Sequence, residues 1–383
     1  MKEARGNRKA FGGVQMVVTG DFCQLPPVLP FEHCVTCGLE TEENKWKGQH
    51  VCPKHGVFKD IDKWAFRSDA WQESGFTHVN LTTIHRQSHK AFIAILHKMR
   101  RGIVLNPGNH NLIVYHPSDT RDAIELYTRK ERVKQRNDEM FDKLPTEPQE
   151  YQCLDSHDWK PDHFEWETMG HIMKGGALSG IHDDRYDAKV ALKEGMLVVL
   201  LHNLDLPAGL VNGSQGTIQR FEKRAPHRMP VASKNSGGYG SQNGQLLLQG
   251  EYAVYRQDKI REFAKQENFP GWPVVKFMNG LERTIYADCT VTELSVGEPK
   301  IVISRTQIPL TAGWAITTHK SQGMTLDRVI VDLSGAFELG QAYVALSRAR
   351  SLEGLKVISF PVSAQGCNAQ VKKFMVEMFG PNW

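Results

Sequence analysis

Three absences narrow the class of protein to which this chain of 383 residues belongs. The longest apolar run is residues 196–201 (MLVVLL), far short of the roughly 20 apolar residues that a membrane-spanning helix needs. No basic segment followed by an apolar one opens the chain, so we expect no secretory leader. Seven cysteines are too few for a disulfide scaffold, which favours a reducing compartment. We therefore expect an intracellular protein with no membrane partner.

The charge balance by itself excludes no class of binding partner. The chain carries 47 Lys and Arg against 43 Asp and Glu, a formal net charge of +4, and 23% of its residues are charged. This balance permits nucleic acid as a partner without arguing for it, because the charged fraction is ordinary.

The length and the pattern of apolar residues predict two or three compact units of mixed α/β structure, since a domain usually holds about 100–200 residues. Residues 14–21 (VQMVVTGD) and 79–84 (VNLTTI) are expected to be strands, the first one buried in a parallel sheet. Helices are expected over 64–71 and 92–99, and another strand over 123–126. Only about a dozen residues precede the first strand, so we expect its sheet neighbours to be missing from this chain.

The middle of the chain differs in character from its two ends. Between about residues 192 and 305, short apolar strands are separated by turn residues, which predicts a small β-barrel. The strands expected there are 196–201, 217–221, 245–248, 274–277 and 301–304. After residue 309 the α/β pattern returns, with core strands over 329–333 and 355–360.

Four separated segments are more polar than the strand or helix ends at which they lie. They are residues 20–28 (GDFCQLPPV), 84–87 (IHRQ), 314–323 (WAITTHKSQG) and 341–350 (QAYVALSRAR). The carboxyl ends of parallel strands are where α/β proteins place ligand-contacting loops. Hydroxyl, imidazole and ammonium groups at an expected helix start, as in the third segment, suit phosphate oxygens. Each segment alone also has an ordinary explanation, as a turn, a surface salt bridge, a helix cap or the end of a buried helix.

In this order, the four segments resemble the third, fourth, fifth and sixth motifs of superfamily 1 helicases of the Pif1-like, RecD-related branch. The family patterns are GDF-x-QLPPV, the arginine of HRQ, THKSQG-x-TL and YVALSRA. Residues 194–216 are also similar to the family segment that leads into an SH3-like insert. The resemblance implies an α/β fold of tandem RecA-like lobes, the first one incomplete, with an SH3-like β-barrel insert in the second.

The resemblance also implies domain boundaries. Residues 1–77 would be the C-terminal remainder of the first RecA-like lobe, with a Cys/His insert at 31–60. The second lobe would comprise residues 78–190 and 306–383, and residues 191–305 would form the SH3-like insert between them.

Individual roles follow from the resemblance position by position. Gln24 would sense the γ-phosphate of ATP, while Arg86 and Arg348 would act as arginine fingers that stabilise charge on the transferring phosphoryl group. The other residues implied to bind the nucleotide are Asp21, Gly323, Gln341 and Tyr343. The residues implied to contact DNA are Thr318, His319, Lys320 and Ser321.

These roles imply an ATP-dependent DNA helicase that uses Mg²⁺ and moves 5′ to 3′ along single-stranded DNA. The implied partners are single-stranded DNA and DNA forks, and the protein would work as a monomer in DNA repair, recombination or telomere maintenance. In a eukaryote its location would be the nucleus or the mitochondrion.

The sequence departs from the family in its phosphate-binding parts. A P-loop needs G-x-x-x-x-G-K-[ST], and no Gly-Lys pair occurs in this chain. The only Asp-Glu pair, Asp138-Glu139, lies in an expected charged helix and not behind an apolar strand, so the acidic Mg²⁺ motif is missing too. We therefore expect a chain that begins inside the first lobe and does not hydrolyse ATP efficiently alone. Two other interpretations remain: a non-catalytic DNA-binding remnant, or the helicase end of a mobile-element replication protein.

A group of cysteines near the N-terminus predicts a metal site. Cys34-x-x-Cys37 is followed after fourteen residues by Cys52-x-x-His55, two ligand pairs whose spacing is typical of tetrahedral structural Zn²⁺. His33 or His50 could replace His55. The alternative is that these are free cysteines in a surface insertion. Cys153, Cys289 and Cys367 are scattered along the chain and are expected to be buried or inert.

Overall fold

The computed structural model of the chain divides into two compact units, which are described separately here. Unit 1 comprises residues 1–118 and 331–383, and unit 2 comprises residues 119–330. The structure describes residues 2, 5–26, 31, 34, 41–44, 49–158, 181, 185–223, 228–233, 241–242, 245–293, 302–361, 363 and 365–383.

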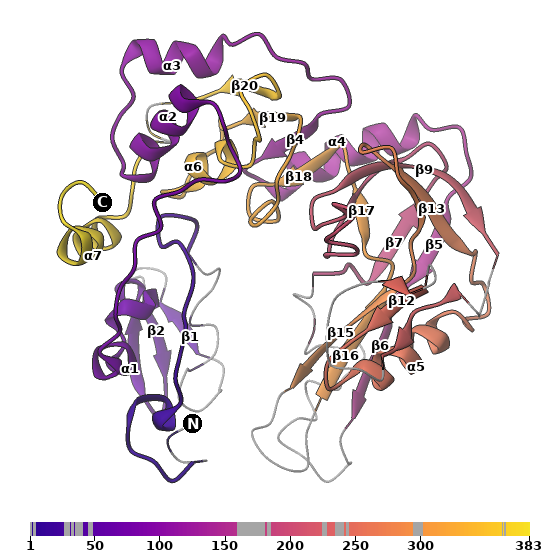
Figure 1. Ribbon diagram of the computed structural model, residues 1–383, viewed down its shortest axis with the longest axis horizontal. Helices are drawn as coiled ribbons and strands as arrows, with labels where there is room; N and C mark the ends of the chain where they lie inside the picture. The colour runs from indigo at the N-terminus through magenta and orange to yellow at the C-terminus, as the bar shows by residue number, and fades with distance from the viewer. Residues whose placement is uncertain are drawn as a thin grey trace. The chain divides into compact units, whose positions relative to one another are not determined.

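Unit 1 combines short helices with a small antiparallel sheet (Figure 1). Its 3-10 helices are η1 (Ala10–Gly13), η2 (Asp60–Lys63) and η3 (Ala65–Arg67). Its α-helices are α1 (Asp69–Ser74), α2 (Lys90–Arg100), α3 (Pro107–Val114), α6 (Gln341–Leu346) and α7 (Ala369–Phe379). Its strands are β1 (Glu42–Asn44), β2 (Gln49–Cys52), β3 (Gly56–Lys59) and β20 (Leu355–Ser359). Helix α3 lies against β20.

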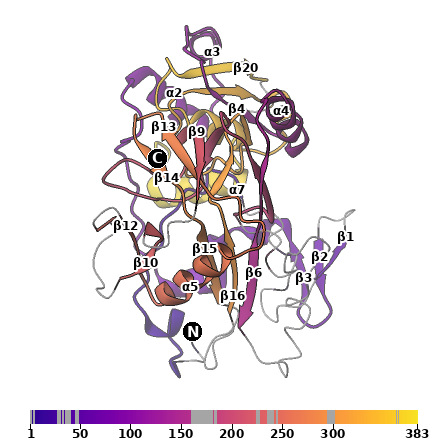
Figure 2. The ribbon, with the colours of Figure 1, turned by 90° about the vertical axis from the view of Figure 1, so that its right-hand side faces the viewer.

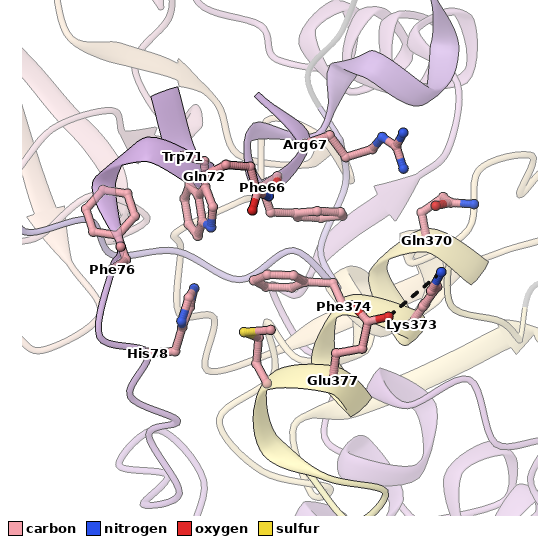
Figure 3. Close-up of a pocket in the computed structure, with 12 residues that line it drawn as sticks. Phe66, Arg67, Trp71, Gln72, Phe76, His78, Gln370, Lys373, Phe374 and Glu377 are labelled. Atoms are coloured by element: carbon pink, nitrogen blue, oxygen red, sulfur yellow. Dashed lines mark hydrogen bonds and ion pairs between the residues drawn. The ribbon is translucent and has the colours of Figure 1, made fainter. Parts of the chain in front are cut away.

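Aromatic side chains hold α7 against the segment around α1. The rings of Phe66 and Phe374 stack with centroids 4.4 Å apart, and the ring of Phe22 packs edge-on against both. Trp71 closes the side of the cluster, where a pocket of about 420 Å³ lies beside the rings (Figure 3). Burial of large aromatic surface is strongly stabilising, so this cluster fixes the C-terminal helix to the segment that begins with Phe22.

Two strands expected in unit 1 are absent. Residues 14–20 and 79–84 have no regular secondary structure. Their apolar side chains are largely exposed, with Val17 83%, Val79 74% and Leu81 86% exposed. A strand forms only where another strand pairs with it, and the described residues supply no partner here. The expectation of a buried parallel strand over 14–21 is therefore wrong for this chain. The expected helix over 64–71 is also displaced, because η3 and α1 occupy residues 65–74.

Unit 2 is built mainly from strands. They are β4 (Ile124–Tyr127), β5 (Gln149–Gln152), β6 (Leu154–Asp158), β7 (Lys189–Leu192), β8 (Leu197–Leu200), β9 (Gln215–Glu222), β10 (Val231–Ala232), β11 (Ser241–Gln242), β12 (Gln245–Leu248), β13 (Trp272–Phe277), β14 (Glu282–Thr284), β15 (Asp288–Glu293), β16 (Val302–Gln307), β17 (Leu310–Ala312) and β18 (Ala315–Thr317). Its helices are α4 (Lys130–Asp142) and α5 (Ala253–Phe263). Strand β19 (Val329–Asp332) crosses the boundary between the units.

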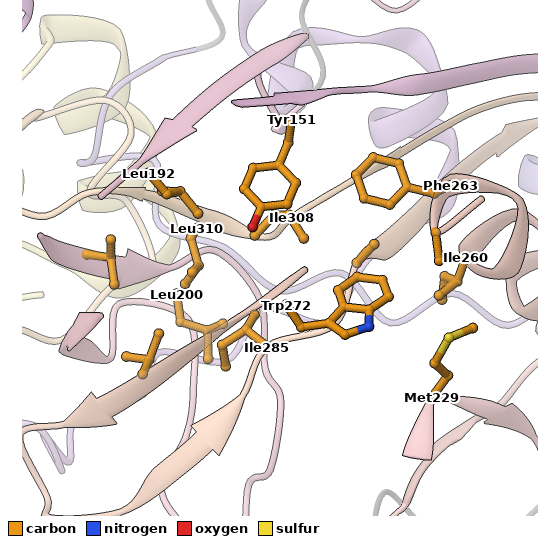
Figure 4. Close-up of a cluster of buried hydrophobic side chains, with 14 of the residues drawn as sticks. Tyr151, Leu192, Leu200, Met229, Ile260, Phe263, Trp272, Ile285, Ile308 and Leu310 are labelled. Atoms are coloured by element: carbon orange, nitrogen blue, oxygen red, sulfur yellow. The ribbon is translucent and has the colours of Figure 1, made fainter. Parts of the chain in front are cut away.

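A five-stranded antiparallel sheet forms the centre of unit 2, in the order β14-β13-β9-β8-β17. Gly216 of β9 allows β13 to approach closely, because a Cβ there would lie 2.8 Å from the carbonyl oxygen of Lys276. Beside the sheet, Tyr151, Phe263 and Trp272 belong to one buried apolar cluster (Figure 4). All five strands expected between residues 192 and 305 are present, as β8, β9, β12, β13 and β16.

A second sheet of unit 2, in the order β15-β16-β6, carries α5 on one side (Figure 2). Within this sheet Arg305 and Asp155 face each other across β16 and β6, and their side chains are each only 2% exposed. The guanidinium donates to both carboxylate oxygens, at 2.8 Å and 2.7 Å, and to the carbonyl oxygen of Tyr186 at 2.9 Å. The pair is satisfied as it stands, and removal of either partner would leave a buried charge.

A parallel pair of strands, β4 and β18, contacts α4 (Figure 1). The side chain of Asn137 on α4 both donates to and accepts from the backbone of Ala315, at 2.9 Å each. This double hydrogen bond fixes the strand that leads into the segment 318–323. That segment is a turn and not the expected helix start. Within the described residues, no helix combines the length and apolar character needed to cross a membrane.

We expect Asp155→Ala to lower the free energy of unfolding of unit 2 by about 3–5 kcal/mol, because Arg305 would remain buried without its counter-charge. Urea unfolding followed by tryptophan fluorescence measures the change. Asp258→Ala is the matched control, since Asp258 lies 4.0 Å from Arg261 and is 65% exposed, and it should change stability by less than about 0.5 kcal/mol. Equal effects of the two substitutions would contradict the structural role of the buried pair.

Candidate functional site

The segment 20–26 positions its polar residues by a tight turn. The backbone N–H of Cys23 donates to the Asp21 carboxylate at 3.1 Å, and the N–H of Gln24 donates to the Asp21 carbonyl at 3.1 Å. Asp commonly forms such turns because its short side chain reaches the backbone two residues ahead. The turn directs the carboxylate of Asp21 towards α2 and leaves the side chain of Gln24 at a pocket.

Asp21 is anchored by two residues from distant parts of unit 1. Arg100, at the end of α2, donates from Nε and Nη2 to its carboxylate at 3.0–3.2 Å. The hydroxyl of Tyr343, in α6, donates to the same carboxylate at 3.3 Å. Burial alone would lower the pKa of Arg100, but Asp21 raises it above its ordinary value. Arg100 was not predicted to take part, because its role here depends on a contact that spacing does not reveal.

The segment 84–87 is joined to the end of α6 by its side chains. Nη1 of Arg86 donates to the carbonyl of Ser347 at 2.8 Å. The side-chain amide of Gln87 donates to the same carbonyl at 3.1 Å and to the carbonyl of Ala349 at 2.8 Å. The last carbonyls of a helix have no partner within the helix, so these donors satisfy the carbonyl of Ser347, the residue that caps α6. Gln87 was not predicted to take part, although it follows the arginine of the HRQ motif directly.

Arg348 is buried next to these groups, with 2% of its surface exposed. Its Nε donates to the carbonyl of Val344 at 2.9 Å, and its Nη2 donates to Oγ of Ser347 at 2.8 Å. Burial, followed by the positive charge of Arg86, lowers the pKa of Arg348 to about 10. Burial also lowers the pKa of Arg86. Two guanidinium groups held together in this way favour an anion beside them.

Gln24, Arg86, Arg100, Tyr343 and Arg348 line one pocket of about 200 Å³. They come from three of the four polar segments and from α2. The first and the last of them, Gln24 and Arg348, are more than 300 residues apart in the sequence. Pockets for drug-sized ligands hold roughly 300–1,000 Å³, so this one suits a phosphate group and not a whole nucleotide. Its lining combines guanidinium, amide and phenol donors, which is the set that phosphate oxygens require.

Gln341, expected to contact the nucleotide, does not line this pocket. Its side chain is fully buried at the start of α6, where Oε1 accepts from the backbone N–H of Phe337 at 3.2 Å. Its Nε2 has no hydrogen-bond partner among the described residues. In this structure Gln341 therefore supports the segment before α6.

The segment 318–323 in unit 2 forms a turn that backbone and hydroxyl hydrogen bonds hold in place. The N–H of Thr318 donates to the Tyr127 carbonyl at 2.9 Å, and Oγ of Ser321 donates to the Thr318 carbonyl at 2.8 Å. Both side chains are buried, whereas Lys320 is exposed and lies 3.5 Å from Asp187. His319 is half-buried, and Gly323 adopts a φ of +81° in open space. Of the residues expected to contact DNA, His319 and Lys320 are thus the more accessible.

Three members of the predicted metal site come together in unit 1. The ligand atoms of Cys34, Cys52 and His55 all lie within 4.8 Å of one another. The turn between β2 and β3 brings Cys52 and His55 together, and both cysteines are buried. Cys37 and His33 lie outside the described residues. His50 lies near Oγ1 of Thr41, at 3.5 Å, and outside the cluster. Two thiols and an imidazole at these distances fit a tetrahedral metal ion.

Comparison with known proteins adds a family context. Residues 188–221 match the family model described as DNA helicase Pif1, 2B domain. The ATP-dependent DNA helicase PIF1 of Xenopus laevis is 31% identical over 385 residues, which cover 98% of this chain and 46% of that protein. The Pif1 helicase of Psychrobacter sp. is 31% identical and is covered to 50%. The chain therefore spans about half the length of these curated relatives.

Solved structures resemble the chain over nearly its whole length. The crystal structure of Pif1 helicase from Candida albicans matches with a TM-score of 0.62 and 25% identity, over 98% of this chain and 72% of that one. A Bacteroides Pif1 structure bound to single-stranded DNA matches with a TM-score of 0.52 and 23% identity, over 98% of this chain and 70% of that one. The latter likeness concerns the fold alone.

We expect Asp21→Asn to lower the free energy of unfolding of unit 1 by about 1–3 kcal/mol, because Arg100 would lose its charged acceptor while partly buried. Thermal and urea unfolding measure this change. Glu73→Gln is the control, since Glu73 pairs with Lys2 at an exposed site, and such pairs contribute little. If the two substitutions were equally mild, the anchoring of Asp21 would not be important for stability.

Proposed function

We propose that this chain belongs to the Pif1 helicase family and forms the phosphate-sensing and strand-gripping portion of an ATP-dependent DNA helicase. The helicase would move 5′ to 3′ along single-stranded DNA in DNA repair, recombination or telomere maintenance. The observation that supports this proposal best is the shared pocket of Gln24, Arg86 and Arg348.

The chemistry of this pocket suits the terminal phosphate of ATP. Arg86 and Arg348 are held close to each other by buried carbonyl groups, so they require no rearrangement when an anion arrives. A bound phosphate would relieve the repulsion between the two guanidinium groups. Charge that develops on the transferring phosphoryl group would be stabilised further by the same donors. A hydrogen bond from the amide of Gln24 to the phosphate would couple phosphate binding to the conformation of the loop that contains Asp21.

The remaining parts of an ATPase site do not fit this chain. The sequence has no Gly-Lys pair for a P-loop, and its only Asp-Glu pair lies in α4. No residue is therefore assigned to Mg²⁺, and we propose that another polypeptide segment supplies these groups. A DNA-binding remnant without catalysis is the alternative. That alternative would be favoured if the chain neither bound phosphate in the pocket nor stimulated the ATPase activity of a separate segment that carries a P-loop.

The proposed DNA-binding residues are His319 and Lys320, with Thr318 and Ser321 shaping the turn that presents them. A Bacteroides Pif1 structure contains single-stranded DNA, and another structure in the same group is described as two coordinating Pif1 helicases at forked DNA. We propose single-stranded DNA and DNA forks as partners of this chain as well. Whether one copy of this chain or two copies bind a DNA fork is then to be tested, and we expect a monomer.

The architecture that we propose is a second RecA-like lobe interrupted by an SH3-like insert. The match of residues 188–221 to the 2B domain model covers β7 to β9, and β9 is central in the five-stranded antiparallel sheet. The parallel pair β4 and β18 with α4 lies outside this insert. A structure of the homologous segment in a complete helicase would test the assignment.

We expect Arg348→Lys to weaken binding of ATP or tripolyphosphate to the chain about 10- to 100-fold. Lysine keeps the positive charge, but it loses the planar fork with several donors that suits phosphate. Isothermal titration calorimetry measures the affinity. Lysine also preserves the bulk at this buried position, so the fold should survive the substitution.

Two controls accompany this measurement. Arg350→Ala removes a nearby exposed arginine outside the pocket and should leave the affinity unchanged. Affinity for an oligothymidine should stay within a few fold in both variants. The chain alone should hydrolyse ATP no faster than background. An unchanged phosphate affinity in Arg348→Lys would remove the proposed role of Arg348.

The Cys/His cluster is proposed to bind one structural Zn²⁺ through Cys34, Cys52 and His55, with Cys37 as the fourth ligand. The purified chain should contain about one equivalent of zinc, measured by inductively coupled plasma mass spectrometry. Cys52→Ser should lose most of it, and Cys153→Ser, a buried cysteine of unit 2, should retain it. Metal should also be released at acidic pH, because protonated ligands do not bind zinc. A metal-free protein at neutral pH would contradict the proposal.

A further inference from the structure

The carboxyl ends of β4 and β18 lie next to each other at one edge of unit 2 (Figure 1). The two strands are parallel, and Tyr127 at the end of β4 pairs with Thr317 at the end of β18. The backbone N–H of Thr318 donates to the carbonyl of Tyr127 at 2.9 Å, which continues the pairing beyond the strands. The segment after β4 and the turn 318–323 after β18 therefore leave the sheet side by side, at the edge where parallel sheets commonly bind ligands.

The segment that follows β4 carries a cluster of positive charge. Residues 127–136 (YTRKERVKQR) contain five basic residues and one acidic residue. Two of the basic residues form ion pairs with carboxylates of the same unit. The other three, Arg129, Lys130 and Arg132, are exposed, and none of them has an ion-pair partner among the described residues. We call these three residues the basic strip.

The basic strip lies at the start of α4, where its charges are unfavourable by themselves. Helix α4 begins at Lys130, and the side chain of Arg129, in the capping position, makes no capping hydrogen bond. The first backbone N–H groups of a helix have no partner within it and carry partial positive charge. They repel the basic strip, and Glu131 is the acidic residue of the first turn that offsets part of this repulsion. A bound anion would remove the repulsion and accept hydrogen bonds from the open N–H groups.

Arg132 lies close to the edge that β4 shares with the turn 318–323. Its guanidinium carbon is 5.8 Å from the ring centroid of Tyr127, the last residue of β4. Arg129 is two residues from Tyr127, a span of at most about 7 Å along the chain. The basic strip and the turn 318–323 thus occupy the same edge of unit 2.

We propose that the basic strip binds successive phosphates of single-stranded DNA and extends the contact surface provided by the turn 318–323. Guanidinium and ammonium groups that lack a protein counter-charge, next to open backbone N–H groups, are the donors that phosphate oxygens require. Such contacts hold the sugar–phosphate backbone and do not read the bases. This inference rests on the proposed function, because it adds residues to the single-strand site assigned there to the turn.

The salt dependence of single-strand binding counts these phosphate contacts. The anisotropy of a labelled oligothymidine gives the affinity of the chain at several salt concentrations, and each phosphate contact adds about 0.7 to the slope of log affinity against log salt. We expect the double variant Arg129→Ala, Arg132→Ala to lower this slope by about 1.4 and to weaken binding at low salt at least about tenfold. Lys134→Ala, on the next turn of α4 and paired with Asp138, is the matched control and should change neither quantity.

Lys130→Glu separates binding from folding. A glutamate at the first position of α4 interacts favourably with the helix dipole, so the melting temperature should stay the same or rise. The affinity for oligothymidine should nevertheless fall at least about tenfold, because one charge of the basic strip is reversed. A fall in the melting temperature together with unchanged affinity would show that Lys130 has a structural role only, and would contradict the proposal.

Hydrogen exchange locates the contact. When the chain is saturated with oligothymidine, amide exchange over residues 130–133 should slow at least about threefold, because the open N–H groups at the helix start become hydrogen-bonded. Exchange in α5, another helix of unit 2, should not change. Unchanged exchange at the start of α4 in the DNA-bound chain would be evidence against binding there.

The outcomes distinguish failure of the basic strip from failure of the proposed function. If the unmodified chain binds oligothymidine and the double variant keeps the same slope, the basic strip is refuted and the turn 318–323 remains the proposed site. Equal affinity for polyaspartate, lost in the same variant, would overturn the proposal by identifying the partner as an acidic protein segment. Absence of any oligothymidine binding would overturn both proposals, and His319→Ala, measured alongside, tests the turn by itself.

Discussion

The candidate site depends on side chains that bind carbonyl groups at the end of α6 and just beyond it. Arg86 and Gln87 donate to the carbonyls of Ser347 and Ala349, and these bonds join segments about 260 residues apart in the chain. A helix end buried without such donors would carry a large desolvation cost. The same bonds bring Arg86 next to Arg348, so the stability of α6 and the assembly of the pocket have one cause.

The three arginines at the pocket lie in two different electrostatic environments. Arg100 is neutralised by Asp21, and Tyr343 completes that cluster. Arg86 and Arg348 donate to carbonyl and hydroxyl groups of α6 and the residue after it, and the pKa of each is lowered by burial. A protein tolerates such a cost where binding of a charged ligand recovers it. The phosphate-sensing role proposed above uses this imbalance.

Local patterns predicted several elements well. The expected helix over 92–99 is α2, the strand over 123–126 is β4, and the five strands of the middle region are all present. Strands 14–21 and 79–84 failed because pairing depends on a partner that local sequence does not provide. The helix expected near residue 318 failed because the hydroxyls of Thr318 and Ser321 bind nearby carbonyls and stabilise a turn. Gln24, Arg86 and Arg348 were identified by motif order, whereas the contacts of Arg100 and Gln87 were not, because they depend on packing.

The unpaired stretches around Val17 and Leu81 have a practical consequence for work with this polypeptide. β-branched and leucine side chains that face water, next to backbone N–H and C=O groups outside any sheet, tend to associate with one another and with extended chains nearby. Such surfaces promote self-association that grows with concentration and with ionic strength. Light scattering or sedimentation of the isolated polypeptide should therefore be measured over a dilution series, and its handling will benefit from low protein concentration.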